Sequence, residues 1–201
     1  MDSNGWPEPQ LSFAQDLPLT QLAIRFAAEH HRSQRRDSDG AQFIAHPVEV
    51  GSLLSRLGYP DFVVAAAVLH DVLEDTDAEP PDLSDQFGRE VCELVALVSD
   101  DPAIEDTEAQ KDDVRDRVRG GSAHAKAVYA ADKVSKVREL RMLMAGGLDR
   151  HQAETKRRRY RKSLEMLEDE RVDGRLVDLL RYELEALENL PPRTTRAASR
   201  A

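Results

Sequence analysis

The densest group of chemically active side chains closes the most apolar stretch of the chain. Residues 62–69 are apolar throughout, and His70-Asp71 and Glu74-Asp75 follow almost at once. On a helix, residues four apart share a face, so His70 aligns with Glu74 and Asp71 with Asp75. Buried charges are usually paired or metal-bound, because an unpaired buried charge is costly. The spacing therefore indicates a pocket for a divalent metal ion and an activated water molecule.

Four side chains are the candidate ligands of that metal. They are His46, His70, Asp71 and Asp132. Two imidazoles and two carboxylates suit Mn²⁺, with Fe²⁺, Mg²⁺ or Zn²⁺ as alternatives. Each motif is weak alone, but the set is stronger: a His-Pro that opens a helix, a His-Asp-x-x-Glu-Asp that ends a buried one, and a single Asp on the apolar face of a later helix. Open coordination positions would then hold water and a substrate oxygen.

Helical periodicity dominates the segments that must position these residues. Asp16 is expected to cap a first helix, His46-Pro47 to open a second, and Asp61 to cap a third that carries the His-Asp and Glu-Asp pairs. Further helices are expected over roughly residues 82–99, from Ser122 to Gly146, and over roughly 149–169 and 172–190. No alternating strand pattern and no internal repeat are found. The prediction is an all-α fold.

The domain organisation follows from the same pattern. One helical domain is expected over residues 16–190, with a mobile N-terminal tail over 1–15 and a mobile C-terminal tail over 191–201. Residues 100–121 are strongly charged, and their preferred interpretation is a solvated helix or mobile loop rather than a substrate-contacting segment.

Composition narrows the partners and the compartment. The chain has 201 residues and a formal charge of −10, which argues against nucleic acid as a partner but allows a small phosphorylated ligand bound through local cations. We expect no membrane partner and no secretory signal, because no apolar run is long enough. Cys92 is the only cysteine, so no internal disulfide can form; we expect it to pack in the core, and the protein to be cytoplasmic.

The chain resembles the HD-domain metal-dependent phosphohydrolases, and among them the alarmone hydrolase domain of the RelA/SpoT type, most of all the stand-alone small alarmone hydrolases. The likeness covers about residues 17–145. The matching text is Ala28-Glu-His-His31-Arg-Ser-Gln34-Arg-Arg36, Phe43-Ile-Ala-His46-Pro47, Ala67-Val-Leu-His70-Asp71-Val-Leu-Glu74-Asp75-Thr76, Phe87-Gly88, and Ala131-Asp132-Lys133 with Val137-Arg138.

The resemblance implies an HD-type helical domain that removes the 3′-pyrophosphate of guanosine tetra- and pentaphosphate (ppGpp and pppGpp), the alarmones of the stringent response. It implies Mn²⁺ on the four ligand candidates. It also implies that Glu74 and Asp75 handle the attacking water, and that Arg36 packs against the nucleotide. This chemistry is coherent, since a metal activates bound water and a nearby carboxylate can orient it or accept its proton.

Three departures from the family pattern concern the nucleotide pocket. Asp37 replaces a lysine, Gln42-Phe43 replaces Pro-Tyr, and Ser135-Lys136 replaces a His or Tyr followed by the Asn that contacts the nucleotide. We therefore expect Lys136 to bind substrate and to read the base less selectively.

Three functions remain open at this point. An alarmone 3′-pyrophosphohydrolase ranks first, because the overall text is so close. An HD phosphohydrolase of another nucleotide fits the altered pocket, and an antitoxin-type regulator of an alarmone synthetase is the third. The partners allowed are a small phosphorylated nucleotide, a second copy of the chain and an alarmone synthetase.

Overall fold

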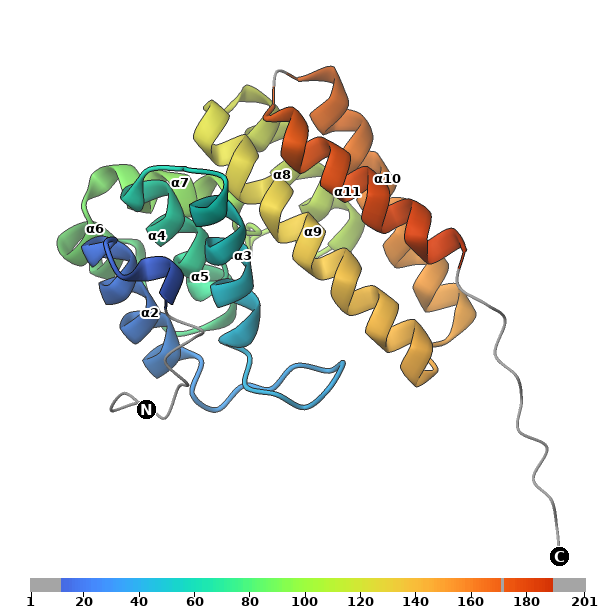
Figure 1. Ribbon diagram of the computed structural model, residues 1–201, viewed down its shortest axis with the longest axis horizontal. Coiled ribbons are helices and arrows are strands. Elements are labelled where there is room, and N and C mark those ends of the chain that lie inside the picture. Colours follow the sequence, from blue (N-terminus) through green and yellow to red (C-terminus); the bar gives the residue numbers. More distant parts are fainter. Residues whose placement is uncertain (1–11, 171, 190–201) are drawn as a thin grey trace, which may run out of the picture.

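The computed structural model describes residues 12–170 and 172–189, and the described chain is helical with no strand (Figure 1). The first half of the described chain contains the short 3₁₀ helix η1 (Ser12–Ala14), then α2 (Pro18–His30), α3 (Ala45–Arg56), α4 (Asp61–Leu69), α5 (Val72–Asp75), α6 (Pro80–Phe87) and α7 (Arg89–Val98). The second half contains α8 (Thr107–Gly120), α9 (Ala123–Gly146), α10 (Arg150–Asp169) and α11 (Gly174–Glu188). The all-α prediction is confirmed.

Helix α4 is the centre of the N-terminal half. Every residue from Val63 to Leu69 is fully buried, because α2, α3, α7 and α9 all pack around it. Gly51 lets α3 approach α4 closely: a Cβ at this position would lie 2.6 Å from a methyl carbon of Val68. The uninterrupted apolar run thus marks a helix buried on all sides rather than an amphipathic one.

Helix α9 joins the two halves of the molecule. In Figure 1 it runs diagonally, with α10 and α11 along one side and α3, α4 and α7 toward the other. Ser122 caps α9 by accepting a hydrogen bond from the Ala125 N–H, as predicted. None of the helices in the described part of the chain is long and apolar enough to cross a membrane.

Two of the expected helices are broken in the structure. The third ends at Leu69 and resumes as α5 at Val72, so His70-Asp71 lies at a break rather than within a helix. The fourth is divided into α6 and α7 by Gly88, whose φ of +86° is a conformation that favours glycine. The periodicity continued across both breaks, so sequence alone did not reveal them.

The two capping predictions for the first and third helices are wrong. Leu17, not Asp16, precedes the first turn of α2, and no side chain of α4's own N-terminus caps it. The Asp61 carboxylate instead accepts hydrogen bonds of 2.9 Å from the N–H groups of both Leu19 and Thr20. Asp61 therefore caps α2 across the interface between α2 and α4, which no local pattern could indicate.

The expected tails lie mostly outside the described residues, which begin at 12 and end at 189. Ser12–Ala14 fall within the expected N-terminal tail, yet Ala14 is buried and the Phe13 carbonyl accepts a hydrogen bond from Ser55 of α3. Cys92 is half-buried against the edge of the core.

Candidate active site

Three parts of the fold bring the four candidate ligands together. His46 comes from the first turn of α3, His70 and Asp71 from the break after α4, and Asp132 from the middle of α9. All four are buried. The Nε2 atoms of His46 and His70 lie 3.2 Å apart, and each lies 3.2 to 3.4 Å from an oxygen of both Asp71 and Asp132. The predicted ligand set therefore converges on one point.

The two buried carboxylates of this cluster need a positive charge beside them. Asp71 Oδ2 and Asp132 Oδ1 are buried and have no hydrogen-bond partner. Burial would raise the pKa of both carboxyls, but the positive charges of His70 and Lys136 at Asp71, and of Lys133 at Asp132, hold both well below their usual range. Burial likewise would lower the pKa of His70, which the two carboxylates raise to about 10. A divalent metal ion would supply the positive charge that these buried carboxylates need, and two imidazoles with two carboxylates are ligands that such an ion accepts.

The two ring nitrogens of His70 have different partners, and the arrangement suits metal binding. Nδ1 lies 2.8 Å from the carbonyl oxygen of Ala67, and a carbonyl can only accept, so Nδ1 carries the proton. Of the two ring nitrogens, Nε2 is therefore the one that faces the cluster, and its lone pair becomes available when a metal ion displaces the Nε2 proton. His46, His70 and Asp132 together form a group whose ligand atoms could hold one ion.

Glu74 lies beside the cluster and belongs to a different charge network. Its carboxylate accepts a hydrogen bond of 3.1 Å from the N–H of Asp100 and lies 3.7 Å from Lys111 Nζ. Burial raises the pKa of Glu74 to about 7, Lys111 lowers it, and Asp71 and Asp100 raise it. Glu74 can therefore gain or lose a proton near neutral pH, as acid–base chemistry requires.

Asp75 is placed differently from Glu74. Both residues are exposed, but Asp75 is not among the residues that line the pocket beside the cluster, whereas Glu74 is. Its main-chain carbonyl accepts a hydrogen bond of 2.6 Å from Gln34, whose side-chain oxygen lies 2.8 Å from His31 Nδ1. Burial and then Asp71 raise the pKa of the Asp75 carboxyl. Of the two predicted catalytic carboxylates, only Glu74 faces the pocket.

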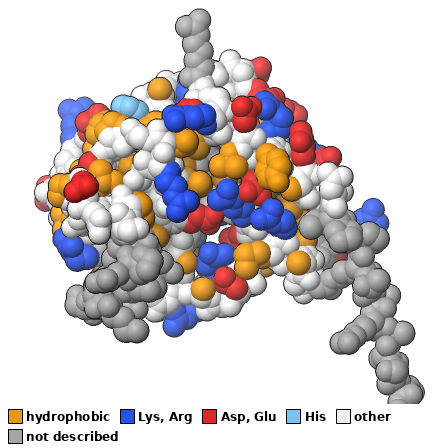
Figure 2. Space-filling model, viewed as in Figure 1, with side chains coloured by type: hydrophobic (Ala, Val, Ile, Leu, Met, Phe, Trp, Pro, Cys, Tyr) orange, Lys and Arg blue, Asp and Glu red, His pale blue; other side chains and the backbone are white. Residues whose placement is uncertain are grey.

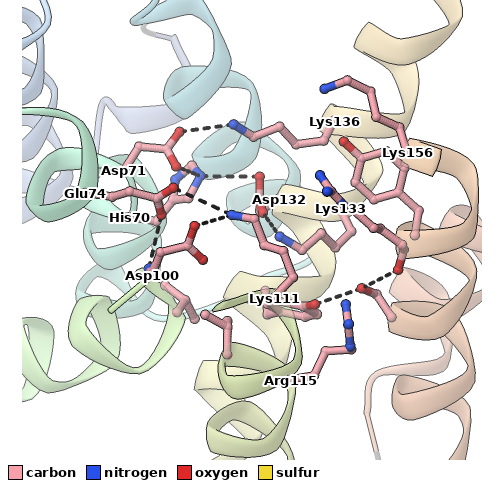
Figure 3. Close-up of a pocket in the computed structure, with 16 residues that line it drawn as sticks. His70, Asp71, Glu74, Asp100, Lys111, Arg115, Asp132, Lys133, Lys136 and Lys156 are labelled. Atoms are coloured by element: carbon pink, nitrogen blue, oxygen red, sulfur yellow. Dashed lines mark hydrogen bonds and ion pairs between the residues drawn. The ribbon is translucent and has the colours of Figure 1, made fainter. Parts of the chain in front are cut away.

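The pocket beside the cluster is rich in cations. Its lining includes His70, Asp71, Glu74 and Asp132, and six basic residues: Lys111, Arg115, Lys133, Lys136, Lys156 and Arg159. Figure 3 shows the ammonium groups of Lys111, Lys133 and Lys136 directed toward the acidic cluster, each joined to a carboxylate. Within the described chain, Lys156 makes no ion pair and no hydrogen bond, so its charge is available to a ligand.

A second pocket adjoins the first and contains the other predicted substrate residue. Its lining includes Arg36, Phe43, Lys136, Lys156 and Tyr160, and the last three also line the first pocket. Arg36 Nε is buried without a hydrogen bond, 3.5 Å from Asp39 and 3.7 Å from Glu139. Lys136 lies between the two pockets, with its Nζ 3.6 Å from Asp71 Oδ2 and 5.7 Å from the centre of the Phe43 ring. Basic side chains are also gathered across the middle of the face shown in Figure 2.

Several pocket residues were missed by the sequence analysis. Many of residues 100–121 are exposed and 107–120 form a helix, as expected, but the solvated interpretation is wrong at Lys111 and Arg115, which line the pocket because α8 packs against α7, α9 and α10. Asp100, which follows α7, lines the pocket as well. Lys156 and Arg159 were missed as well. Buried Val114 and Val118 beside these charges were the available signal, since they give the charged helix an inward face.

Comparisons with known proteins agree with this geometry. A family model described as "HD domain" matches residues 23–145. The guanosine-3′,5′-bis(diphosphate) 3′-pyrophosphohydrolase MESH1 of Mus musculus is 37% identical over 135 residues, 66% of this chain and 75% of the relative. A guanosine-3′,5′-bis(diphosphate) 3′-pyrophosphohydrolase of Aquifex aeolicus is 38% identical over 87 residues, 43% of this chain but only 12% of the relative.

A solved structure extends the likeness beyond the matched segment. It is described as "a metazoan ortholog of SpoT" that "hydrolyzes ppGpp and plays a role in starvation responses". It superposes with a TM-score of 0.77 at 28% identity, and the match covers 86% of this chain and 97% of that one. The match therefore includes much of the helical part that follows residue 145.

Proposed function

The chain belongs to the HD-domain family, and we propose that it is a metal-dependent phosphohydrolase that removes the 3′-pyrophosphate of guanosine tetra- and pentaphosphate. The observation that carries the proposal is the convergence of His46, His70, Asp71 and Asp132 at the wall of a pocket lined by six basic residues. A metal cluster alone would suit many hydrolases. The surrounding cations select a polyanionic substrate in a protein whose overall charge is −10.

The four clustered residues would hold the divalent ion, with Mn²⁺ as our proposal and Fe²⁺, Mg²⁺ or Zn²⁺ as alternatives. When bound, such an ion lowers the pKa of its water and neutralises phosphate charge. Glu74 would orient the attacking water and accept its proton, since its carboxyl titrates at about pH 7. Asp75 would act at a distance, by adding negative charge beside Glu74.

Different parts of the substrate would bind in the two pockets. Lys111, Lys133 and Lys136 surround the cluster and would bind the scissile pyrophosphate through charge-assisted hydrogen bonds. Lys156 lines both pockets and would bind the phosphates between them. Arg36, Phe43 and Tyr160 offer a guanidinium plane and two rings in the second pocket, which suit a nucleoside.

A second candidate function is hydrolysis of another nucleotide, and Lys136 is the observation that favours it. Its ammonium group lies beside Asp71 and the Phe43 ring, where relatives of the RelA/SpoT type carry an amide. An ammonium group donates but cannot accept, so it cannot read both donors and acceptors of a base edge. The chemistry at the metal would be the same.

Product analysis with the purified protein tests the proposal. We expect incubation with Mn²⁺ and guanosine tetraphosphate to release pyrophosphate and GDP, as followed by ³¹P NMR and nucleotide chromatography. The isosteric variant Asp132→Asn is the control and should release neither. Release of single phosphate groups would contradict 3′-pyrophosphohydrolase activity, and hydrolysis only of other nucleotides would support the second candidate.

The setting of the enzyme is also a proposal. A cytoplasmic location suits a nucleotide hydrolase with one half-buried cysteine. A second copy of the chain or an alarmone synthetase would be its macromolecular partner, and size-exclusion chromatography with and without a synthetase tests both.

A further inference from the structure

The second ring nitrogen of His46 is the start of a chain of polar side chains. Its Nδ1 lies 2.9 Å from the hydroxyl oxygen of Ser135, which stands one turn beyond Asp132 on α9. The same hydroxyl lies 2.7 Å from Oε2 of Glu49, on the helix that carries His46. Ser135 is 2% exposed, so its contact with His46 forms in the interior, whereas its contact with Glu49 lies nearer the surface, because the Glu49 side chain is 32% exposed.

The direction of each hydrogen bond in this chain is determined by its last member. A hydroxyl can donate or accept, so Ser135 alone would leave the proton of His46 unassigned. A carboxylate only accepts, so Ser135 donates to Glu49 and its free lone pair accepts from His46 Nδ1–H. The proton of His46 is thereby placed on Nδ1, and Nε2 presents a lone pair to His70, Asp71 and Asp132.

Glu49 is itself anchored from the C-terminal part of the molecule. Its second oxygen accepts a hydrogen bond of 2.9 Å from Arg138, which also donates to Glu183 of α11 over 2.7 Å. Glu183 is 5% exposed, and its other oxygen accepts from Arg141 over 2.9 Å. Glu49 is therefore held by Arg138, whose guanidinium is in turn held by the buried carboxylate of Glu183.

His46 and His70 differ in what controls them. The Nδ1 of His70 donates to a main-chain carbonyl, which no substitution removes. The Nδ1 of His46 depends on side chains alone, and Ser135 is one of the positions where the sequence departs from the RelA/SpoT pattern. Partners behind metal ligands of this kind typically change metal affinity 10- to 100-fold when they are removed.

We propose that Ser135 and Glu49 are positioning residues that hold His46 as its Nδ1–H tautomer and so keep Nε2 free to bind a divalent metal ion. The inference rests on the metal centre of the proposed function and not on the identity of the nucleotide. Ser135 and Glu49 would thus affect how tightly the site binds its metal ion, and they would not contact the substrate.

The substitution Glu49→Gln gives the sharpest test, because it keeps the shape of the side chain and reverses the hydrogen bonds. Arg138 can only donate, so it takes the amide oxygen of the new side chain and leaves the amide NH₂ facing Ser135. Ser135 then accepts from the amide, and its own proton, which no carboxylate now takes, is free to turn toward His46 Nδ1. When Ser135 donates to Nδ1, the proton of His46 moves to Nε2, where it blocks the metal.

Binding of Mn²⁺ alone, without nucleotide, is measured by the loss of the free-ion EPR signal. Glu49→Gln and Ser135→Ala should each bind Mn²⁺ about 10- to 100-fold more weakly than the unaltered protein. The matched controls are Ser55→Ala, which removes one serine hydrogen bond elsewhere on α3, and Glu93→Gln, which neutralises an exposed carboxylate of α7. Both controls should bind Mn²⁺ as the unaltered protein does.

A spectroscopic measurement separates positioning from general damage. In protein loaded with diamagnetic Zn²⁺ and labelled with ¹⁵N-histidine, the Nδ1–H proton of His46 should be protected from exchange, and Ser135→Ala should remove that protection. Unchanged Mn²⁺ affinity in Glu49→Gln overturns the inference even if Ser135→Ala fails to fold. Failure of the unaltered protein to bind Mn²⁺ would instead overturn the metal centre of the proposed function.

Discussion

The acidic residues of the site have different charged partners, and their pKa values differ as a result. Asp71 and Asp132 are buried among cations that hold their pKa values well below the usual range, so they remain ionised ligand candidates. Glu74 is linked to Lys111 and Asp100 instead, and its pKa is raised to about 7. A group that titrates near the working pH is suited to proton transfer, whereas a permanently ionised one is suited to hold a metal.

The substitution Glu74→Gln should separate turnover from metal binding. Gln keeps the size of the side chain but cannot accept the proton of the attacking water. We expect the bound metal per chain to stay the same and kcat to fall by about 100-fold or more. Elemental analysis and steady-state kinetics on the same preparation check this. Full activity would make Glu74 a structural residue.

The pH dependence of kcat should report Glu74 and respond to Lys111. A general base works when it is deprotonated, so kcat should rise with pH through about 7. The positive charge of Lys111 lowers the pKa of Glu74, so Lys111→Met should raise that pKa and shift the rising limb to higher pH. A kcat profile from about pH 5 to 9 measures the shift, and a limb that stays in place or moves down contradicts the assignment.

Lys136 should reduce the preference for guanine. Its ammonium group lies where the two pockets meet, so it can bind phosphate but reads a base edge poorly. We expect Lys136→Asn to increase the ratio of kcat/KM for the guanosine over the adenosine 3′-pyrophosphates. A strong guanine preference in the unaltered protein that the substitution leaves unchanged would show that Lys136 takes no part in specificity.

At the scale of elements, the site depends on how closely α3 and α4 pack. His46 lies on α3, and the His70-Asp71 break follows α4, so the distance between these helices sets the distance between the two imidazoles. Gly51 is where the helices meet, one turn beyond His46 on α3, and it faces Val68. The break after Leu69 then turns both His70 and Asp71 toward α9.

Gly51→Ala should destabilise the fold and weaken metal binding together. The added Cβ would lie 2.6 Å from a methyl carbon of Val68, so either the Val68 side chain or the two helices must shift, and a shift of α3 takes His46 with it. Overpacking of this kind costs about 1–3 kcal/mol. Gly120→Ala is the control, because nothing lies within 4 Å of a Cβ at that helical position. Urea unfolding and Mn²⁺ titration of both variants check the prediction, and equal stabilities would contradict it.

At the scale of the whole molecule, a chain of net charge −10 places six basic residues around one pocket. Lys111 and Arg115 come from α8, Lys133 and Lys136 from α9, and Lys156 from α10. The matched HD-domain segment ends at residue 145, so α10 adds Lys156 and Arg159 from outside it. The acidic cluster and four of the six basic residues thus lie within the matched segment, and α10 supplies the other two basic residues.

Metal binding should stabilise the whole fold, because the candidate ligands join α3, α4 and α9. A free ion concentration of about 100 times its Kd adds about 2.7 kcal/mol to the free energy of unfolding. For a chain of this length that should raise Tm by roughly 5–10 °C. Differential scanning calorimetry with Mn²⁺, and again after EDTA, measures it. Asp132→Asn should abolish the shift. A Tm that does not change with Mn²⁺ would contradict a metal site formed jointly by α3, α4 and α9.

Sequence alone determined the residue types of the site and the helical class of the fold. Three local patterns could be recognised because each places polar side chains on an apolar face, where charge is costly. They are the His-Pro, the His-Asp-x-x-Glu-Asp and the isolated Asp132. The apolar run before His70 likewise predicted a buried helix, because such a run lowers the free energy only when it is removed from water.

Only the tertiary structure decided how these patterns meet. The cap that Asp61 supplies to α2, the pocket position of Lys111 and the relay from His46 through Ser135 to Glu49 all join residues distant in sequence or on different helices. Local periodicity shows that a helix has an inward face but not which helix that face will contact. The direction of the hydrogen bonds at His46, on which our proposal for the metal site rests, is therefore a property of the packed molecule.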